Sequence, residues 1–186
     1  MLIDLRGEEA AEPLPVSTGD LPPTDLVGPL VADAYARYRE LEEGRVADYI
    51  PALARVDPGL FGIAVVGSDG RVHEAGDVDH AFTIQSISKL FVFALVCQEI
   101  GYLAARDQLG VNATGLPFNS VMAIELNADR TMNPMVNAGA IATTSLVPGE
   151  SAAAKWQFIR EGLSRFAGRP LSIDIEVYES EAATNQ

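Results

Sequence analysis

The amino-acid sequence predicts a mixed fold of the α/β (α+β) class, in which an antiparallel β-hairpin accompanies several helices. An apolar, β-branched run at 61–66 precedes a Gly-Ser-Asp-Gly turn at positions 67–70, and an alternating segment follows it at 71–75. This pattern predicts a hairpin over residues 61–75. A nearly continuous apolar run from Ser86 to Ile100, followed by Gly101, is typical of a buried helix that ends at a glycine. Helical spacing of apolar residues recurs on both sides of these two elements.

The chain before the hairpin divides into two parts. Residues 1–23 are acidic, contain four prolines and show no sustained periodicity, so we expect a flexible lead-in. From Asp25 onward, apolar residues recur at spacings of three and four, which predicts a helix that stops near Gly44. A shorter helical piece is predicted over residues 46–54. Folded structure is therefore expected over residues 24–186.

Three further helices are predicted after the buried one. The first opens at residues 118–120. The second uses Asn133 as its N-cap and Pro134 as its first helical residue, and it extends to about Leu146. The third ends at Gly168. Its apolar face carries Trp156, Ile159, Leu163 and Phe166.

The end of the chain has the pattern of a helix start. Ser180 is predicted to be an N-cap, and Glu181 would lie in the first turn, where the macrodipole favours an acid. The sequence then stops at Gln186, and one isolated turn is unstable because helix nucleation is unfavourable. The residues leave two interpretations open: a frayed tail, or a truncated piece of a longer protein.

Composition disfavours several classes of function. Thirteen Lys and Arg against 26 Asp and Glu give a net charge of −13, which argues against nucleic-acid and anionic-membrane partners. One cysteine and two histidines are too few for a Cys/His zinc cluster. The longest apolar stretch, Leu90–Val96, is too short to span a bilayer, and the N-terminus lacks the charge pattern of a signal peptide. We therefore expect a soluble cytoplasmic protein.

The pattern that could carry chemistry is Ser86-x-x-Lys89, at the start of the buried helix. Residues three apart share one side of a helix, so the hydroxyl and the amine can touch. A lysine desolvated by apolar neighbours loses proton affinity and can accept the serine proton. Backbone amides at a helix start can also stabilise developing negative charge. Together these features predict an activated serine nucleophile.

An ordinary structural role for these residues is also open. Lys89 is one of two lysines, beside eleven arginines, and an apolar run follows it directly. Such a lysine either reaches solvent along its apolar stem or takes part in a reaction. Ser88 is a rival nucleophile, but it adjoins Lys89 in sequence and is expected to point away from it.

Three other candidates also allow two interpretations each. Asn137 lies where asparagine is a poor helix former, so its amide is expected to have a partner, either a core group or a polar substrate. Taken alone, Glu181 is a surface acid that suits a helix start. Tyr49 precedes Ile50 and Pro51, and a tyrosine in such a place is more often a packing residue than a catalytic one.

Several segments taken together resemble the serine-dependent glutaminase family. They are, in chain order, residues 47–51, 85–89, 118–120, 133–141 and 177–181. The resemblance extends from about Leu26 to the C-terminus. It implies the fold of serine β-lactamases and penicillin-binding proteins, an antiparallel sheet flanked by helices. It also makes residues 24–186 the N-terminal portion of a glutaminase domain.

The resemblance implies hydrolysis of L-glutamine to L-glutamate and ammonia. Ser86 would be the nucleophile and Lys89 its proton acceptor, with Tyr49 near the reacting centre. Ser86, Asn137 and Glu181 match substrate-binding positions, and Glu181 would hold the α-amino group of the substrate. No metal or organic cofactor is implied, and a homo-oligomer, either a dimer or a tetramer, is expected.

The chain departs from the family in its length. Family positions that bind substrate (an asparagine, two tyrosines and a valine) fall beyond Gln186, as do strands that extend the sheet. We therefore expect a truncated chain whose hairpin has an unpaired edge and an uncovered apolar face. One alternative is a non-catalytic fragment or interaction module of a glutaminase. Another is a different hydrolase of β-lactamase-like fold, which the lack of a signal-peptide pattern disfavours.

Overall fold

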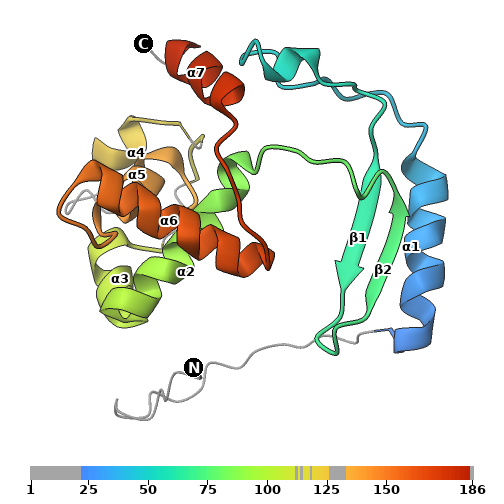
Figure 1. Ribbon diagram of the computed structural model, residues 1–186, viewed down its shortest axis with the longest axis horizontal. Coiled ribbons are helices and arrows are strands. Elements are labelled where there is room, and N and C mark those ends of the chain that lie inside the picture. Colours follow the sequence, from blue (N-terminus) through green and yellow to red (C-terminus); the bar gives the residue numbers. More distant parts are fainter. Residues whose placement is uncertain (1–21, 112, 114, 118, 126–132, 185–186) are drawn as a thin grey trace. The chain divides into compact units, whose positions relative to one another are not determined.

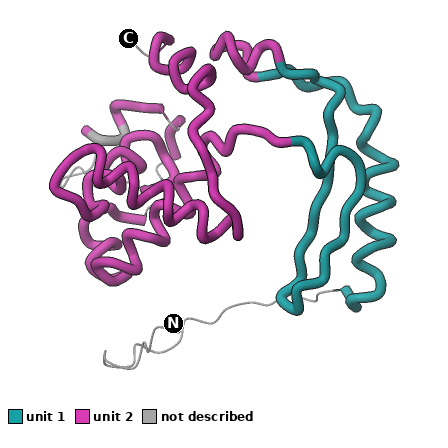
Figure 2. The backbone as a smooth tube through the Cα atoms, viewed as in Figure 1, with its two compact units in different colours: residues 1–46, 56–80 teal, residues 47–55, 81–186 magenta. Residues whose placement is uncertain are grey.

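The structure is a computed structural model and is drawn in Figure 1. It describes residues 22–111, 113, 115–117, 119–125 and 133–184. The predictions for residues 1–21 and for Phe118 lie outside these ranges. The chain divides into two compact units, which Figure 2 shows in different colours. The first comprises Met1–Val46 and Val56–His80, and the second comprises Ala47–Arg55 and Ala81–Gln186.

The first unit contains the predicted β-hairpin and one helix. Its elements are α1 (Thr24–Tyr38), β1 (Gly62–Val66) and β2 (Val72–Gly76). The two strands pair antiparallel, with Ile63 opposite Ala75, so the predicted hairpin is confirmed. The mixed class of the fold, with an antiparallel sheet and helices, is confirmed with it.

Helical structure before the hairpin is shorter than the sequence predicts. Helix α1 ends at Tyr38 and not near Gly44. The acids that follow over residues 40–43 would oppose the negative C-terminal end of the helix macrodipole. The piece predicted over 46–54 forms turns and one 3-10 turn, η1 (Leu53–Arg55), because Pro51 interrupts helical hydrogen bonding.

Helix α1 covers one face of the hairpin. Gly28 lies against His73, where an added Cβ would be 3.3 Å from Nδ1. The ring of Tyr35 stacks on that of Phe61 with centroids 5.5 Å apart. A Cβ at Gly76 would come within 2.2 Å of the Tyr35 ring, and the φ of 77° is left-handed. Only glycine fits at this position.

The opposite face of the hairpin is open to solvent. It carries Ala64, Val66, Val72 and Glu74, whose cross-strand pairs alternate with the pair of Ile63 and Ala75. All four are exposed. Within the described residues the sheet has two strands, so each strand also has an outer edge without a ladder partner.

The second unit is helical and forms its core around one apolar helix. Its elements are η2 (Gln85–Ile87), α2 (Ser88–Ile100), α3 (Tyr102–Leu109), α4 (Met122–Glu125), α5 (Asn137–Ser145), α6 (Ala152–Ala167) and α7 (Ile175–Thr184). Helix α2 packs against α3, α5 and α6 and buries Val92, Leu95 and Val96. A Cβ added at Gly162 of α6 would lie 2.3 Å from Cδ1 of Leu95, so the two helices approach closely there. The predicted buried helix is confirmed.

Glycines end α2 and α6 as the sequence predicts. Gly101 has a φ of 83°, and its N–H donates to the carbonyl of Cys97. Gly168 adopts the left-handed conformation with a φ of 65°. Cys97 is partly buried against the core of this unit, and this burial raises the pKa of its thiol.

Helix α5 begins at Asn137, so the predicted start at Asn133 is wrong. The Oδ1 of Asn133 accepts a hydrogen bond from the N–H of Met135 at 2.8 Å, which forms a turn and not a helix cap. This turn lies directly on the helix, since a Cβ at Gly139 would be 1.9 Å from the Asn133 carbonyl oxygen. Glycine at position 139 therefore allows the turn to pack there.

Helix α7 begins at Ile175, so the prediction that Ser180 caps a final helix is wrong. Asp174 fills that role, because its Oδ1 accepts from the N–H of Val177 at 3.0 Å and its carbonyl accepts from the N–H of Tyr178. As a result, Glu181 lies in the second half of α7 and not in the first turn of a helix.

Candidate active site

The side chain of Lys89 joins the start of α2 to the start of α5. Its Nζ donates to Oδ1 of Asn137 at 2.6 Å and to the carbonyl of Met135 at 3.3 Å. The turn made by Asn133 precedes α5 and includes Met135. Two segments separated by more than forty residues thus meet at one amine, and we call Ser86, Lys89 and Asn137 the amine cluster.

Burial lowers the pKa of Lys89, because removal of water disfavours the charged ammonium. The side chain is partly buried, and both of its acceptors are neutral amide oxygens. A neutral amine has two N–H donors and one lone pair. If the donors serve Asn137 and Met135, the lone pair is left to accept a proton from a third group.

Ser86 lies one turn before Lys89 in the same helical segment. It belongs to the 3-10 turn η2, which leads directly into α2, and residues three apart in such a turn lie one above the other. Ser86 is exposed, whereas Lys89 is partly buried. The hydroxyl is therefore accessible to a substrate, and the amine lies one turn behind it.

Gln85, which precedes Ser86, has a strained backbone. Its φ of 44° is the one left-handed value that a non-glycine residue adopts among the described residues. This conformation costs on the order of 1 kcal/mol for a residue with a Cβ. Such strain is concentrated at functional sites, and it changes the direction of the chain just before Ser86.

The rival serine has a structural role. The Oγ of Ser88 donates to the carbonyl of Gln85 at 2.7 Å, and its N–H is also directed to the carbonyls of Gln85 and Ser86. Its hydroxyl is therefore engaged in holding the strained turn. This contact favours Ser86 over Ser88 as the candidate nucleophile.

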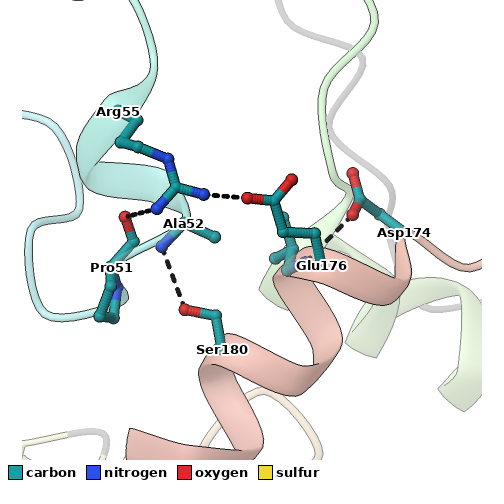
Figure 3. A network of polar contacts seen from close by, with 7 residues as sticks. Pro51, Ala52, Arg55, Asp174, Glu176 and Ser180 are labelled. Atoms are coloured by element: carbon teal, nitrogen blue, oxygen red, sulfur yellow. Dashed lines mark hydrogen bonds and ion pairs between the residues drawn. The ribbon is translucent and has the colours of Figure 1, made fainter.

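The other two candidates lie on segments that contact each other. Tyr49 belongs to residues 47–55 and is 69% exposed, and Glu181 lies on α7 and is partly buried. Figure 3 shows the polar contacts between these segments: the N–H of Ala52 donates to Oγ of Ser180 at 3.0 Å, and Arg55 pairs with Glu176. We call this pair of segments the α7 seam.

The site residues thus fall into two groups. Lys89 contacts Asn137 directly, and Ser86 is one turn from Lys89 in the same helical segment. Tyr49 and Glu181 belong to the α7 seam. Sequence reasoning missed the Met135 carbonyl and the strain at Gln85. The two residues lie in separate segments that carry the family resemblance, 85–89 and 133–141. The backbone conformation of a glutamine, however, has no signal in the sequence.

Two kinds of site find no support among the residues that the structure describes. No group of three His, Cys, Asp or Glu side chains there could hold a metal ion. No single described helix has the length and apolar composition needed to cross a membrane. Only the pair 85–100 and 102–109, bent by 119°, meets that criterion when the two are joined, by length and composition alone.

Comparison with known proteins identifies the family. The sequence model of the family described as Glutaminase matches residues 44–186, and the chain belongs to this family. Glutaminase 2 of Yersinia pestis is 56% identical over 170 residues, which are 91% of this chain and 50% of that protein. A glutaminase of Colwellia psychrerythraea is 49% identical over 164 residues, 88% of this chain and 53% of that protein.

Solved structures agree with this assignment. The probable glutaminase ybaS matches with a TM-score of 0.83 and 42% identity, over 88% of this chain and 53% of that one. A probable glutaminase from Bacillus subtilis, complexed with 6-diazo-5-oxo-L-norleucine, matches with a TM-score of 0.71 and 32% identity, over 95% of this chain and 51% of that one. The predicted β-lactamase-like fold class is confirmed, and the chain spans about half the length of the relatives it matches.

Proposed function

We propose that this chain carries the reacting groups of a glutaminase, which hydrolyses L-glutamine to L-glutamate and ammonia through a serine acyl-enzyme. The observation that carries the proposal is the contact of Lys89 with Asn137, one turn from an exposed serine, in a chain of the glutaminase family. The activity of longer relatives motivates the substrate, and the amine cluster motivates the mechanism.

The reaction then proceeds in two steps. In the first, Oγ of Ser86 bonds to the side-chain carbonyl carbon of glutamine while Nζ of Lys89 takes the hydroxyl proton. The C–N bond breaks, and Lys89 returns that proton to the departing nitrogen, which leaves as ammonia. In the second step, water gives a proton to Lys89 and attacks the ester. Glutamate leaves, and Ser86 recovers its proton.

Substrate recognition is divided between the two groups of residues. Asn137 combines a contact to Lys89 with an amide N–H₂ that can donate to the substrate. Glu181 offers a partly buried carboxylate, which suits an α-ammonium group because charge-assisted hydrogen bonds are strong. Tyr49 supplies an exposed phenol as a further donor near the reacting atoms. No cofactor takes part in this scheme.

We also propose that the working protein is a cytoplasmic homo-oligomer, a dimer or a tetramer. The family resemblance motivates this state, and the net charge of −13 suits a protein that avoids nucleic acid and anionic membranes. Light scattering of the purified chain measures its mass and would contradict the proposal if the chain were a monomer.

Glutamate release from L-glutamine by the purified 186-residue chain tests the proposed function. Ser86→Ala should reduce turnover by several orders of magnitude, because no other group replaces the nucleophile. Ser88→Ala is the matched comparison, since it removes the neighbouring hydroxyl and should retain much more activity. Wild-type turnover that persists in Ser86→Ala would refute the nucleophile assignment. A chain without turnover would favour a non-catalytic part of a glutaminase.

A further inference from the structure

A hydrogen bond from a backbone N–H to a serine hydroxyl connects two distant parts of the second unit. The N–H of Ala52 donates to Oγ of Ser180 at 3.0 Å, across 128 positions of sequence (Figure 3). Ala52 is buried and Ser180 is partly buried, so this contact is partly shielded from water. A buried backbone N–H that loses its acceptor is costly, and Ser180 is the acceptor in this structure.

The hydroxyl of Ser180 is used differently from those of the two threonines in α5. Thr143 and Thr144 donate to carbonyls four positions earlier in their own helix. Ser180 instead accepts from a separate segment. Glu176, four positions earlier on the same face of α7, pairs with Arg55 of that segment. Two contacts one turn apart therefore fix how α7 is rotated about its axis.

The less exposed of these two contacts, the hydrogen bond of Ala52 to Ser180, is the stronger determinant of this rotation. The side chains of Arg55 and Glu176 are 62% and 72% exposed, and exposed ion pairs contribute little because water screens them. The hydrogen bond to Ala52 is shielded and directional, and it joins the seam closer to Glu181. Loss of the hydroxyl should therefore shift α7, whereas loss of the ion pair alone should not.

We propose that Ser180 is a positioning residue for substrate binding, and this inference rests on the proposed function. Glu181 follows Ser180 directly, so the direction of its carboxylate changes with any rotation of α7 about the Ser180 contact. Tyr49 lies three positions before Ala52 in the segment that Ser180 holds. The hydroxyl thus holds the helix of Glu181, the proposed substrate-binding carboxylate, against the segment that carries Tyr49.

The test compares Ser180→Ala with a closely matched serine. Ser164 of α6 also lies within a helix, and its Oγ accepts from the N–H of Leu171 at 3.0 Å in a partly buried place. Both variants remove the same kind of hydrogen bond, but only Ser180 belongs to the α7 seam. Ser180→Thr keeps the hydroxyl and serves as the conservative variant.

Four quantities should be measured on the full chain: KM and kcat for L-glutamine, the Kd for L-glutamate, and the hydrogen-exchange rate of the Ala52 amide. Ser180→Ala should raise KM and Kd roughly tenfold, the change expected for one buried hydrogen bond, with kcat within about threefold of wild type. It should also accelerate exchange at Ala52. Ser180→Thr should stay near wild type, and Ser164→Ala should leave KM unchanged.

The possible failures are distinguishable. A wild-type chain that neither hydrolyses nor binds L-glutamine would overturn the proposed function and this inference with it. A functional wild type with an unchanged KM in Ser180→Ala would overturn the inference alone. An equal rise of KM in Ser164→Ala would show a general loss of packing and would also overturn it, as would unchanged exchange at Ala52.

Discussion

The two groups of site residues are held by different physical means. In the amine cluster, Lys89 lies on α2, which buries three side chains and packs against α3, α5 and α6. In the α7 seam, helix α7 has no fully buried residue. A hydrogen bond and an exposed ion pair join it to residues 47–55. The proposed reacting groups, Ser86 and Lys89, therefore lie at a well-packed helix. Glu181, which is proposed to bind the substrate, lies on a helix held by a few polar contacts.

Replacing Lys89, the proposed base, should have the largest effect on activity. Lys89→Arg should reduce glutamate release by about three orders of magnitude, because a guanidinium stays protonated and cannot accept the Ser86 proton. The chain provides a matched control in its other lysine. Lys155 donates to the carbonyl of Ser145, which an arginine can also do, so Lys155→Arg should stay near wild type. Comparable losses of glutamate release in the two variants would show that the chain tolerates arginine poorly at either lysine, and would contradict a specific role of Lys89 as the base.

Truncating a side chain in each group should compare their contributions to folding. Leu95 is 2% exposed on α2, and Leu95→Ala should lower the free energy of unfolding by about 2–5 kcal/mol. Val177 on α7 is partly buried, so Val177→Ala should cost clearly less. Urea denaturation measures both values. A larger loss for Val177→Ala would reverse the contrast between the two groups.

A negative charge placed beside Lys89 should shift the pH dependence of kcat/KM, and its effect on activity should be smaller than that of Lys89→Arg. Asn137→Asp puts a carboxylate next to Lys89, which favours the ammonium and raises the pKa of that group. The proposed base works only when neutral, so the acid limb of kcat/KM should move to higher pH. Activity at pH 7 should fall by about tenfold for each unit of that movement and recover at higher pH. A fixed acid limb would exclude Lys89 as the titrating base.

Local patterns in the sequence predicted much of the fold but not all helix starts. The hairpin turn at 67–70 and the apolar run of α2 are local signals, and both elements formed where expected. Asn133 and Ser180 are suitable cap residues by type, yet neither caps a helix. Asp174 provides the cap for α7, and packing against Gly139 turns Asn133 into a loop residue. Competition between several possible caps depends on tertiary contacts.

The candidate site was similarly predictable only in part. The spacing of Ser86 and Lys89 could be found in the sequence, because it lies within one helical turn. The contact of Lys89 with Asn137 and that of Ala52 with Ser180 join residues far apart in the chain. No periodicity predicts such contacts. The family resemblance proposed roles for Asn137 and Glu181, and the structure adds the partners that hold their segments.

Cys97, the one cysteine of this chain, can report how often the core around α2 opens. The thiolate is the form of cysteine that attacks an alkylating reagent. In the folded chain the raised pKa of Cys97 lowers the fraction of thiolate, and partial burial restricts access to it. Cys97 packs against the core that α2 shares with Ile159 of α6, so its labelling rate follows local opening there. The rate at which an alkylating reagent modifies Cys97, followed by mass spectrometry, therefore measures how often the core around α2 opens. The measurement requires no substitution of a candidate site residue.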